Sequence, residues 1–114
     1  MKRTKQTKHI ARHRRVRAKI WGDASRPRLS VSRSVRYLRV QLIDDAKGVT
    51  IVSASDVKVQ KGTKTERATA IGLEIAKKAK EKGVTAVVFD RGGFRFHGRI
   101  AAVAEGARQG GLIF

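Results

Sequence analysis

The fold is decided by residues 28–55, which read RLSVSRSVRYLRVQLIDDAKGVTIVSAS. Apolar and polar residues alternate through three segments of this stretch, at 28–33, 37–44 and 49–55. Such alternation is typical of strands that bury one face and expose the other. The links between the segments are short, and Gly48 in the second link can take a positive φ. The pattern therefore predicts an antiparallel meander of three strands.

Two helices are predicted after the meander. Thr63 and Glu66 have the spacing of a capping box, and apolar positions follow at intervals of three and four as far as about Lys82. The positions expected to face inward are Ala68, Ile71, Gly72, Ile75, Ala76 and Ala79. A second helix is expected over residues 98–109, before a glycine pair. Its expected inward positions are Ile100, Val103, Ala104 and Ala107.

A short buried strand is predicted at 86–89, and residues 112–114 could add a final edge strand or plug the core. The expected order is α-β-β-β-α-β-α with a possible final β. This order indicates an α/β (α+β) protein with a mixed β-sheet and helices packed on one face of it. We expect a basic N-terminal arm over residues 1–25 and a compact RNA-binding domain over residues 26–114. The opposite face of the sheet is left partly bare.

Positive charge is concentrated near the N-terminus. The 114 residues include 27 Lys+Arg and 9 Asp+Glu, which gives a net charge of +18. Residues 1–40 hold 14 of these basic residues and only one of the acidic residues. Basic blocks of this kind typically reach into nucleic acid, whose phosphates release counterions when they are neutralised. Like charges one turn apart oppose a free helix, so we expect residues 8–20 to become helical on RNA. The arm residues predicted to contact RNA are Arg12, Arg14, Arg15 and Arg17.

The bare face of the predicted sheet carries polar and basic side chains. On the meander these are Arg28, Ser30, Ser32, Tyr37, Arg39 and Gln41, with Arg33, Ser34 and Arg36 at the hairpin edge. Guanidinium groups bind phosphate as a fork, hydroxyls suit phosphate oxygens and ribose hydroxyls, and a tyrosine ring can stack on a base. We predict that this face binds RNA, against the alternative of an ordinary solvated surface.

A second candidate site is the loop FDRGGFRFHGR, residues 89–99, between the short strand and the last helix. The glycine pair allows close backbone approach, and the N-terminus of the following helix can receive a phosphate. The loop residues predicted to contact RNA are Arg91, Gly92, Gly93, Phe94, Phe96, His97 and Arg99. The two phenylalanines could instead cap the small core.

Other chemistries have little support. The chain has no cysteine, which excludes disulfides, thiolate metal sites and cysteine nucleophiles. Asp90 is better explained as a residue that orders the glycine loop or pairs with an arginine than as a catalytic acid. His9 and His13 lie among arginines that repel a cation. We therefore expect no enzyme, no cofactor and no metal. Short apolar runs also predict a cytoplasmic protein without a membrane span or secretion signal.

The same loop carries a family resemblance. Phe89-Asp90-Arg91-Gly92-Gly93, followed by Phe96-His97-Gly98-Arg99, resembles the signature loop of the bacterial large-subunit ribosomal protein L-eighteen family, a universal 5S rRNA-binding family. The family usually carries tyrosine where this chain has Phe94 and Phe96. The segment around Arg26-Pro27-Arg28, the third strand and the C-terminus are also similar to the family, so the resemblance covers most of the chain from Arg26 onward.

The resemblance implies a structural constituent of the large ribosomal subunit. It implies binding to 5S rRNA and help in attaching that RNA to 23S rRNA in the central protuberance. The implied partners are these two RNAs and neighbouring large-subunit ribosomal proteins, and the implied location is the cytoplasmic ribosome. Charge alone also permits an alternative, a protein that compacts nucleic acid without sequence preference.

Overall fold

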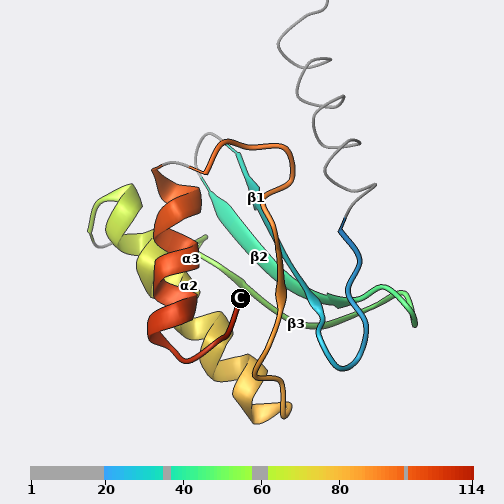
Figure 1. Cartoon of the computed structure of the whole chain (residues 1–114). Coiled ribbons are helices and arrows are strands. Elements are labelled where there is room, and N and C mark those ends of the chain that lie inside the picture. Colours follow the sequence, from blue (N-terminus) through green and yellow to red (C-terminus); the bar gives the residue numbers. More distant parts are fainter. Residues whose placement is uncertain (1–19, 35–36, 58–61, 97) are drawn as a thin grey trace, which may run out of the picture.

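The computed structural model describes residues 20–34, 37–57, 62–96 and 98–114. Its elements are β1 (Arg28–Arg33), β2 (Leu38–Asp44), β3 (Val49–Ser55), α2 (Lys64–Glu81), β4 (Val88–Asp90) and α3 (Arg99–Gln109). The strands form one sheet in the order β3-β2-β1-β4, in which only the β1–β4 pair is parallel. Both helices lie on the same side of this sheet (Figure 1). The predicted α+β class with a mixed sheet is confirmed, whereas the predicted arm helix lies, apart from Ile20, outside the described residues.

The meander forms as the alternation predicts. The strands β1 and β3 begin and end at the predicted residues, whereas β2 begins one residue later than expected, at Leu38. Asp56 marks that boundary, because its buried carboxylate accepts a hydrogen bond of 2.7 Å from the Leu38 amide. Leu29, Val31, Leu38, Val40 and Leu42 point toward the helices and form the sheet side of the core.

The two helices pack closely on each other. Thr63 caps α2 through a 3.1 Å hydrogen bond from the Glu66 amide, and the six predicted inward positions of α2 are all buried. The helices meet at two glycines: a Cβ on Gly72 would lie 2.3 Å from the Val103 carbonyl oxygen. A Cβ on Gly106 would lie 2.2 Å from the carbonyl oxygen of Thr69. Because these two glycines have no side chains, the helix backbones can approach each other closely at this crossing.

The strand β4 begins two residues later and ends one residue later than the strand predicted at 86–89. Its position is set by pairing with β1, where Arg28 lies opposite Val88 and Ser30 opposite Asp90. Ala86 instead forms an isolated parallel bridge with Ile113, while Leu112 is buried in the core. The expectation that the C-terminus plugs the core is therefore met by Leu112, whereas in place of an edge strand the segment forms only this single bridge.

The chain enters the domain at Gly22. Here it lies against β1: a Cβ on Gly22 would be 2.1 Å from the Arg28 nitrogen. The Gly22 amide donates to the Asp45 carboxylate at 2.9 Å, and the Asp45 amide donates to the Gly22 carbonyl at 2.8 Å. Arg28 and Asp45 also pair on the face of the sheet that the helices leave open, so the entry point lies on that face.

Candidate nucleic-acid interface

The open face of the sheet groups the side chains as the alternation predicts. Directly paired residues of neighbouring strands share a face, so Gln41 beside Ser30 and Arg39 beside Ser32 lie together. The third strand extends this group, because Ser53 lies opposite Gln41 and Ser55 opposite Arg39. We define the open-face cluster as Ser30, Ser32, Arg39, Gln41, Ser53 and Ser55. Ser53 and Ser55 were missed as candidates, although the same alternation in residues 49–55 indicates them.

Arg28 lies on this face but is not presented to a partner. Only 8% of the residue is exposed, and its guanidinium forms ion pairs of 2.9 Å with Asp45 and 2.8 Å with Asp90. Burial lowers the pKa of Arg28, but the hydrogen bonds to Asp45 and Asp90 outweigh that effect and the pKa is raised overall. Arg28 was predicted to contact RNA; in the structure these ion pairs occupy its guanidinium, which joins β1, the β2–β3 turn and β4.

Asp90 also orders the glycine loop. Its second carboxylate oxygen accepts a 2.8 Å hydrogen bond from the Gly92 amide, and the side chain is fully buried. Gly92 and Gly93 have φ of 64° and 81°, a region that favours glycine. Both of the interpretations favoured for Asp90, pairing with an arginine and ordering the loop, are confirmed. Because both glycines are buried, they shape the loop and present little surface themselves.

The hairpin end of the sheet gathers further candidates. The Arg33 guanidinium lies 5.0 Å from the centre of the Phe94 ring, and Arg99 donates a 3.1 Å hydrogen bond to the Ser34 carbonyl. A hollow of about 280 Å³ at this end is lined in part by Ser32, Arg33, Ser34, Tyr37, Arg39 and Ser55. These contacts tie the tip of the hairpin to the start of α3.

The two loop phenylalanines differ in their surroundings. Phe94 is partly buried and packs against the core, as the core-cap interpretation expects. Phe96 is 50% exposed and meets Phe89 edge-on, with ring centres 6.0 Å apart. Phe89 in turn stacks on Phe114 at 5.4 Å. Of the pair, Phe96 therefore offers the larger accessible aromatic surface.

Several predicted site residues lie outside the described residues. They are Arg12, Arg14, Arg15, Arg17, Arg36 and His97. In the part of the chain that the structure describes, no group of three or more acidic or histidine side chains could hold a metal ion. Neither described helix is long and apolar enough to cross a bilayer.

Sequence comparison assigns the chain to a family. The family model described as ribosomal L18 of archaea, bacteria, mitochondria and chloroplasts matches residues 2–114. The chain belongs to this ribosomal L18 family. It is 59% identical over 105 residues to the large ribosomal subunit protein uL18 of Limosilactobacillus reuteri (strain DSM 20016), covering 90% of this chain and 89% of that protein. The protein of the same name from Streptococcus suis (strain 05ZYH33) is 55% identical over 105 residues, with 90% and 87% covered.

Membership in the L18 family confirms the resemblance seen in the loop. It makes the chain a structural constituent of the large ribosomal subunit and not an enzyme. The expected ribosomal location is confirmed with it. The charge of +18 is accordingly the charge of a ribosomal protein, which argues against a general compactor of nucleic acid.

Proposed function

We propose that the chain binds 5S rRNA and helps attach it to 23S rRNA in the central protuberance of the large subunit. The observation that supports this most is the open face of the sheet (Figure 1), which none of the described helices covers. The open-face cluster supplies four hydroxyls, one amide and one guanidinium on adjacent strands. Asp45 and Asp90 are paired with Arg28, so they add little repulsion toward an anion. Glu74 of α2 also lines a hollow beside Arg39 and Gln41, where the positive charge of Lys78 offsets it.

The chemistry of this face suits a folded RNA. Helical RNA has a wide, shallow minor groove that presents 2′-hydroxyls and phosphates. Serine hydroxyls both donate and accept hydrogen bonds, and Arg39 adds a fork for phosphate. Tyr37, 43% exposed at the hairpin end, adds a ring for an unpaired base or a sugar. Affinity then comes mostly from phosphate contacts, and specificity from the shape of the RNA.

Replacing Arg39 tests whether the open face is the binding surface. We expect Arg39→Ala to weaken 5S rRNA binding by about 1–3 kcal/mol, because a charged hydrogen bond to phosphate is lost. Filter binding at fixed salt measures the effect. The control is Lys77→Ala, which removes one positive charge from an exposed position of α2, on the covered side of the sheet. Equal affinity for 5S rRNA in both variants and the wild type would show that RNA binds elsewhere.

Removing residues 1–21 tests the basic arm. If the arm makes on the order of five phosphate contacts, its loss should flatten the dependence of log K on log salt by roughly three to five units. The measurement is a salt titration of 5S rRNA binding by the full and shortened chains. An unchanged slope would mean that the arm does not bind the RNA backbone.

The proposal as a whole is tested by RNA preference. The full chain should favour 5S rRNA over unrelated RNA and duplex DNA at matched salt, and the preference should survive excess competitor RNA. Equal binding to all three would favour nonspecific association with polyanions.

A further inference from the structure

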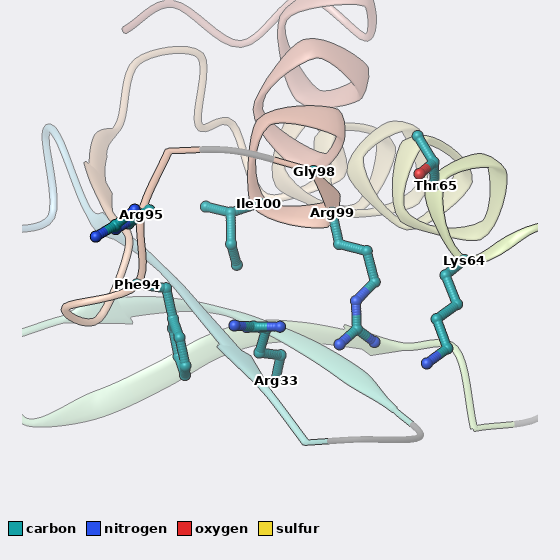
Figure 2. Close-up of a pocket in the computed structure, with 8 residues that line it drawn as sticks. All are labelled: Arg33, Lys64, Thr65, Phe94, Arg95, Gly98, Arg99 and Ile100. Atoms are coloured by element: carbon teal, nitrogen blue, oxygen red, sulfur yellow. The ribbon is translucent and has the colours of Figure 1, made fainter. Parts of the chain in front are cut away.

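A pocket lies on the other side of the hairpin end from the open face. Its volume is about 580 Å³, and it lies where the end of β1 meets the first turns of α2 and α3 and the loop before α3. Figure 2 shows Arg33, Lys64 and Arg99 reaching into this space from three different elements. Arg95 also lines it, and none of the eight described lining residues is acidic.

The cations that surround the pocket are held in place. Arg33 lies over the Phe94 ring, and one terminal nitrogen of Arg99 bonds to the Ser34 carbonyl. The other terminal nitrogen, Nη1, is buried and has no hydrogen-bond partner among the residues that the structure describes. A guanidinium cannot lose its proton in a protein, so a buried N–H left without an acceptor is costly. This donor needs an acceptor, and an anion in the pocket can supply one when the Arg99 side chain turns Nη1 toward it.

The start of α3 also lacks hydrogen-bond acceptors. Its N-cap is Gly98, which makes no side-chain capping bond, and the first turn holds no acidic residue. The first backbone amides of a helix lack intrahelical acceptors and favour an anion. The pocket therefore combines several converging cations, a buried guanidinium donor and the N-terminus of α3. Each of these groups is stabilised by a negatively charged oxygen.

We infer that this pocket binds a backbone phosphate of the RNA. The inference rests on the proposed function and extends it, because it carries the RNA contact from the open face around the hairpin tip to the helix side. Arg33 lines both the hollow beside the open-face cluster and this pocket, so the two surfaces are continuous. A strand crossing the tip can thus place successive phosphates in both. The tetrahedral oxygens of phosphate can accept from Arg33, Arg99 and the helix amides together.

The free, full-length chain provides the first test. Inorganic phosphate replaces chloride at constant ionic strength while amide and arginine side-chain signals are followed by ¹⁵N NMR. We expect saturable shifts at Arg99 and Ile100, and no comparable shift at Lys77, which is outside the pocket. Uniform small shifts across the chain, without saturation, would overturn the inference.

Two variants and two matched controls locate the binding. Arg99→Gln and Lys64→Glu should each weaken phosphate binding about tenfold or more, as expected for a lost charged contact. The acid introduced by Lys64→Glu falls in the first turn of α2, where the helix dipole favours it, so the fold is kept. Lys77→Gln and Lys47→Glu make the same charge changes at exposed positions outside the pocket and should leave phosphate binding unchanged. Equal losses in the variants and their controls would overturn the inference.

Two further comparisons identify the source of the phosphate. Dimethyl phosphate, which mimics the RNA backbone, should shift the same signals, whereas acetate should act much more weakly. A stronger response to acetate would overturn the inference and indicate a carboxylate from a neighbouring protein. In 5S rRNA binding, Arg99→Gln should lower the affinity about tenfold and the salt slope by about one unit.

The outcomes separate this inference from the proposed function. If all variants bind 5S rRNA as the wild type does and phosphate produces no saturable shift, the pocket assignment fails while the proposed function stands. If phosphate produces saturable shifts at the pocket but the wild-type chain does not bind 5S rRNA, the proposed function fails. The phosphate bound by the pocket would then not come from 5S rRNA.

Discussion

Asp90→Ala is expected to destabilise the fold by about 3 kcal/mol, because it removes one of the two carboxylates that pair with the largely buried Arg28 and leaves only Asp45. Asp90 is fully buried and accepts from both Arg28 and the Gly92 amide, so the substitution also removes the acceptor that orders the glycine loop. Chemical denaturation of the free protein, followed by circular dichroism, measures the change in the free energy of unfolding. The control, Glu81→Ala at the exposed end of α2, should change it by less than about 0.5 kcal/mol.

A double variant separates the charge from the packing. Arg28→Met combined with Asp90→Ala removes the buried guanidinium that has lost one of its two carboxylate partners, so the double variant should be more stable than Asp90→Ala alone. The coupling energy from the four proteins then reports the ion pair directly. If Asp90→Ala unfolds at the same denaturant concentration as the wild type, Arg28 finds enough stabilisation from Asp45 and the role assigned to Asp90 is wrong.

Gly106→Val is expected to cost about 3 kcal/mol or more, because overpacking at a backbone contact cannot be relieved by a change of rotamer. The nearest atom to a new Cβ is the Thr69 carbonyl oxygen, at 2.2 Å, so the two helices would have to separate. Their separation would open the core beside Ile75 and Val103, which are fully buried. Thermal unfolding, with the neighbouring exposed position Glu105→Ala as control, measures the loss.

Gly72→Ala tests the same crossing from the other helix. Its Cβ would meet the Val103 carbonyl oxygen at 2.3 Å, so a loss of stability is expected despite the better helix propensity of alanine. Wild-type melting temperatures for Gly106→Val would show that α3 can shift on α2 without cost and that the close approach is not required.

The sequence patterns predict the fold well wherever buried residues recur at a regular spacing. Alternation in the meander and the spacing of apolar residues in α2 both depend on which face meets the core, and that information is local. The position of β4 depends instead on pairing with β1, a contact between distant residues, and its predicted start was wrong by two residues. The α2–α3 crossing at Gly72 and Gly106 is also nonlocal, and the spacing of residues does not reveal it.

The sequence predicts which side of the sheet each candidate residue lies on, but not which residues it pairs with. Alternation places Arg28 and Arg39 on the same side of the sheet, yet only Arg39 is exposed. The difference arises because Asp45 and Asp90 come from a turn and a strand that fold back beside Arg28. Arg33 has the parity of Leu29 and Val31, so its place on the helix side could have been foreseen. The pocket that it helps to line could not, because the pocket forms only where two helix ends and a loop meet.

The anchoring of Gly22 has a further consequence for the kinetics of assembly. Because its backbone is bonded to Asp45 at both the amide and the carbonyl, the basic tail is tethered at a fixed point on the sheet. Tethering of this kind turns the second encounter with a ligand into an intramolecular one, at an effective concentration in the millimolar range for a short linker. If the tail and the sheet both bind RNA as we propose, an RNA bound first by the tail meets the sheet at high local concentration, and it dissociates only when both contacts are broken together.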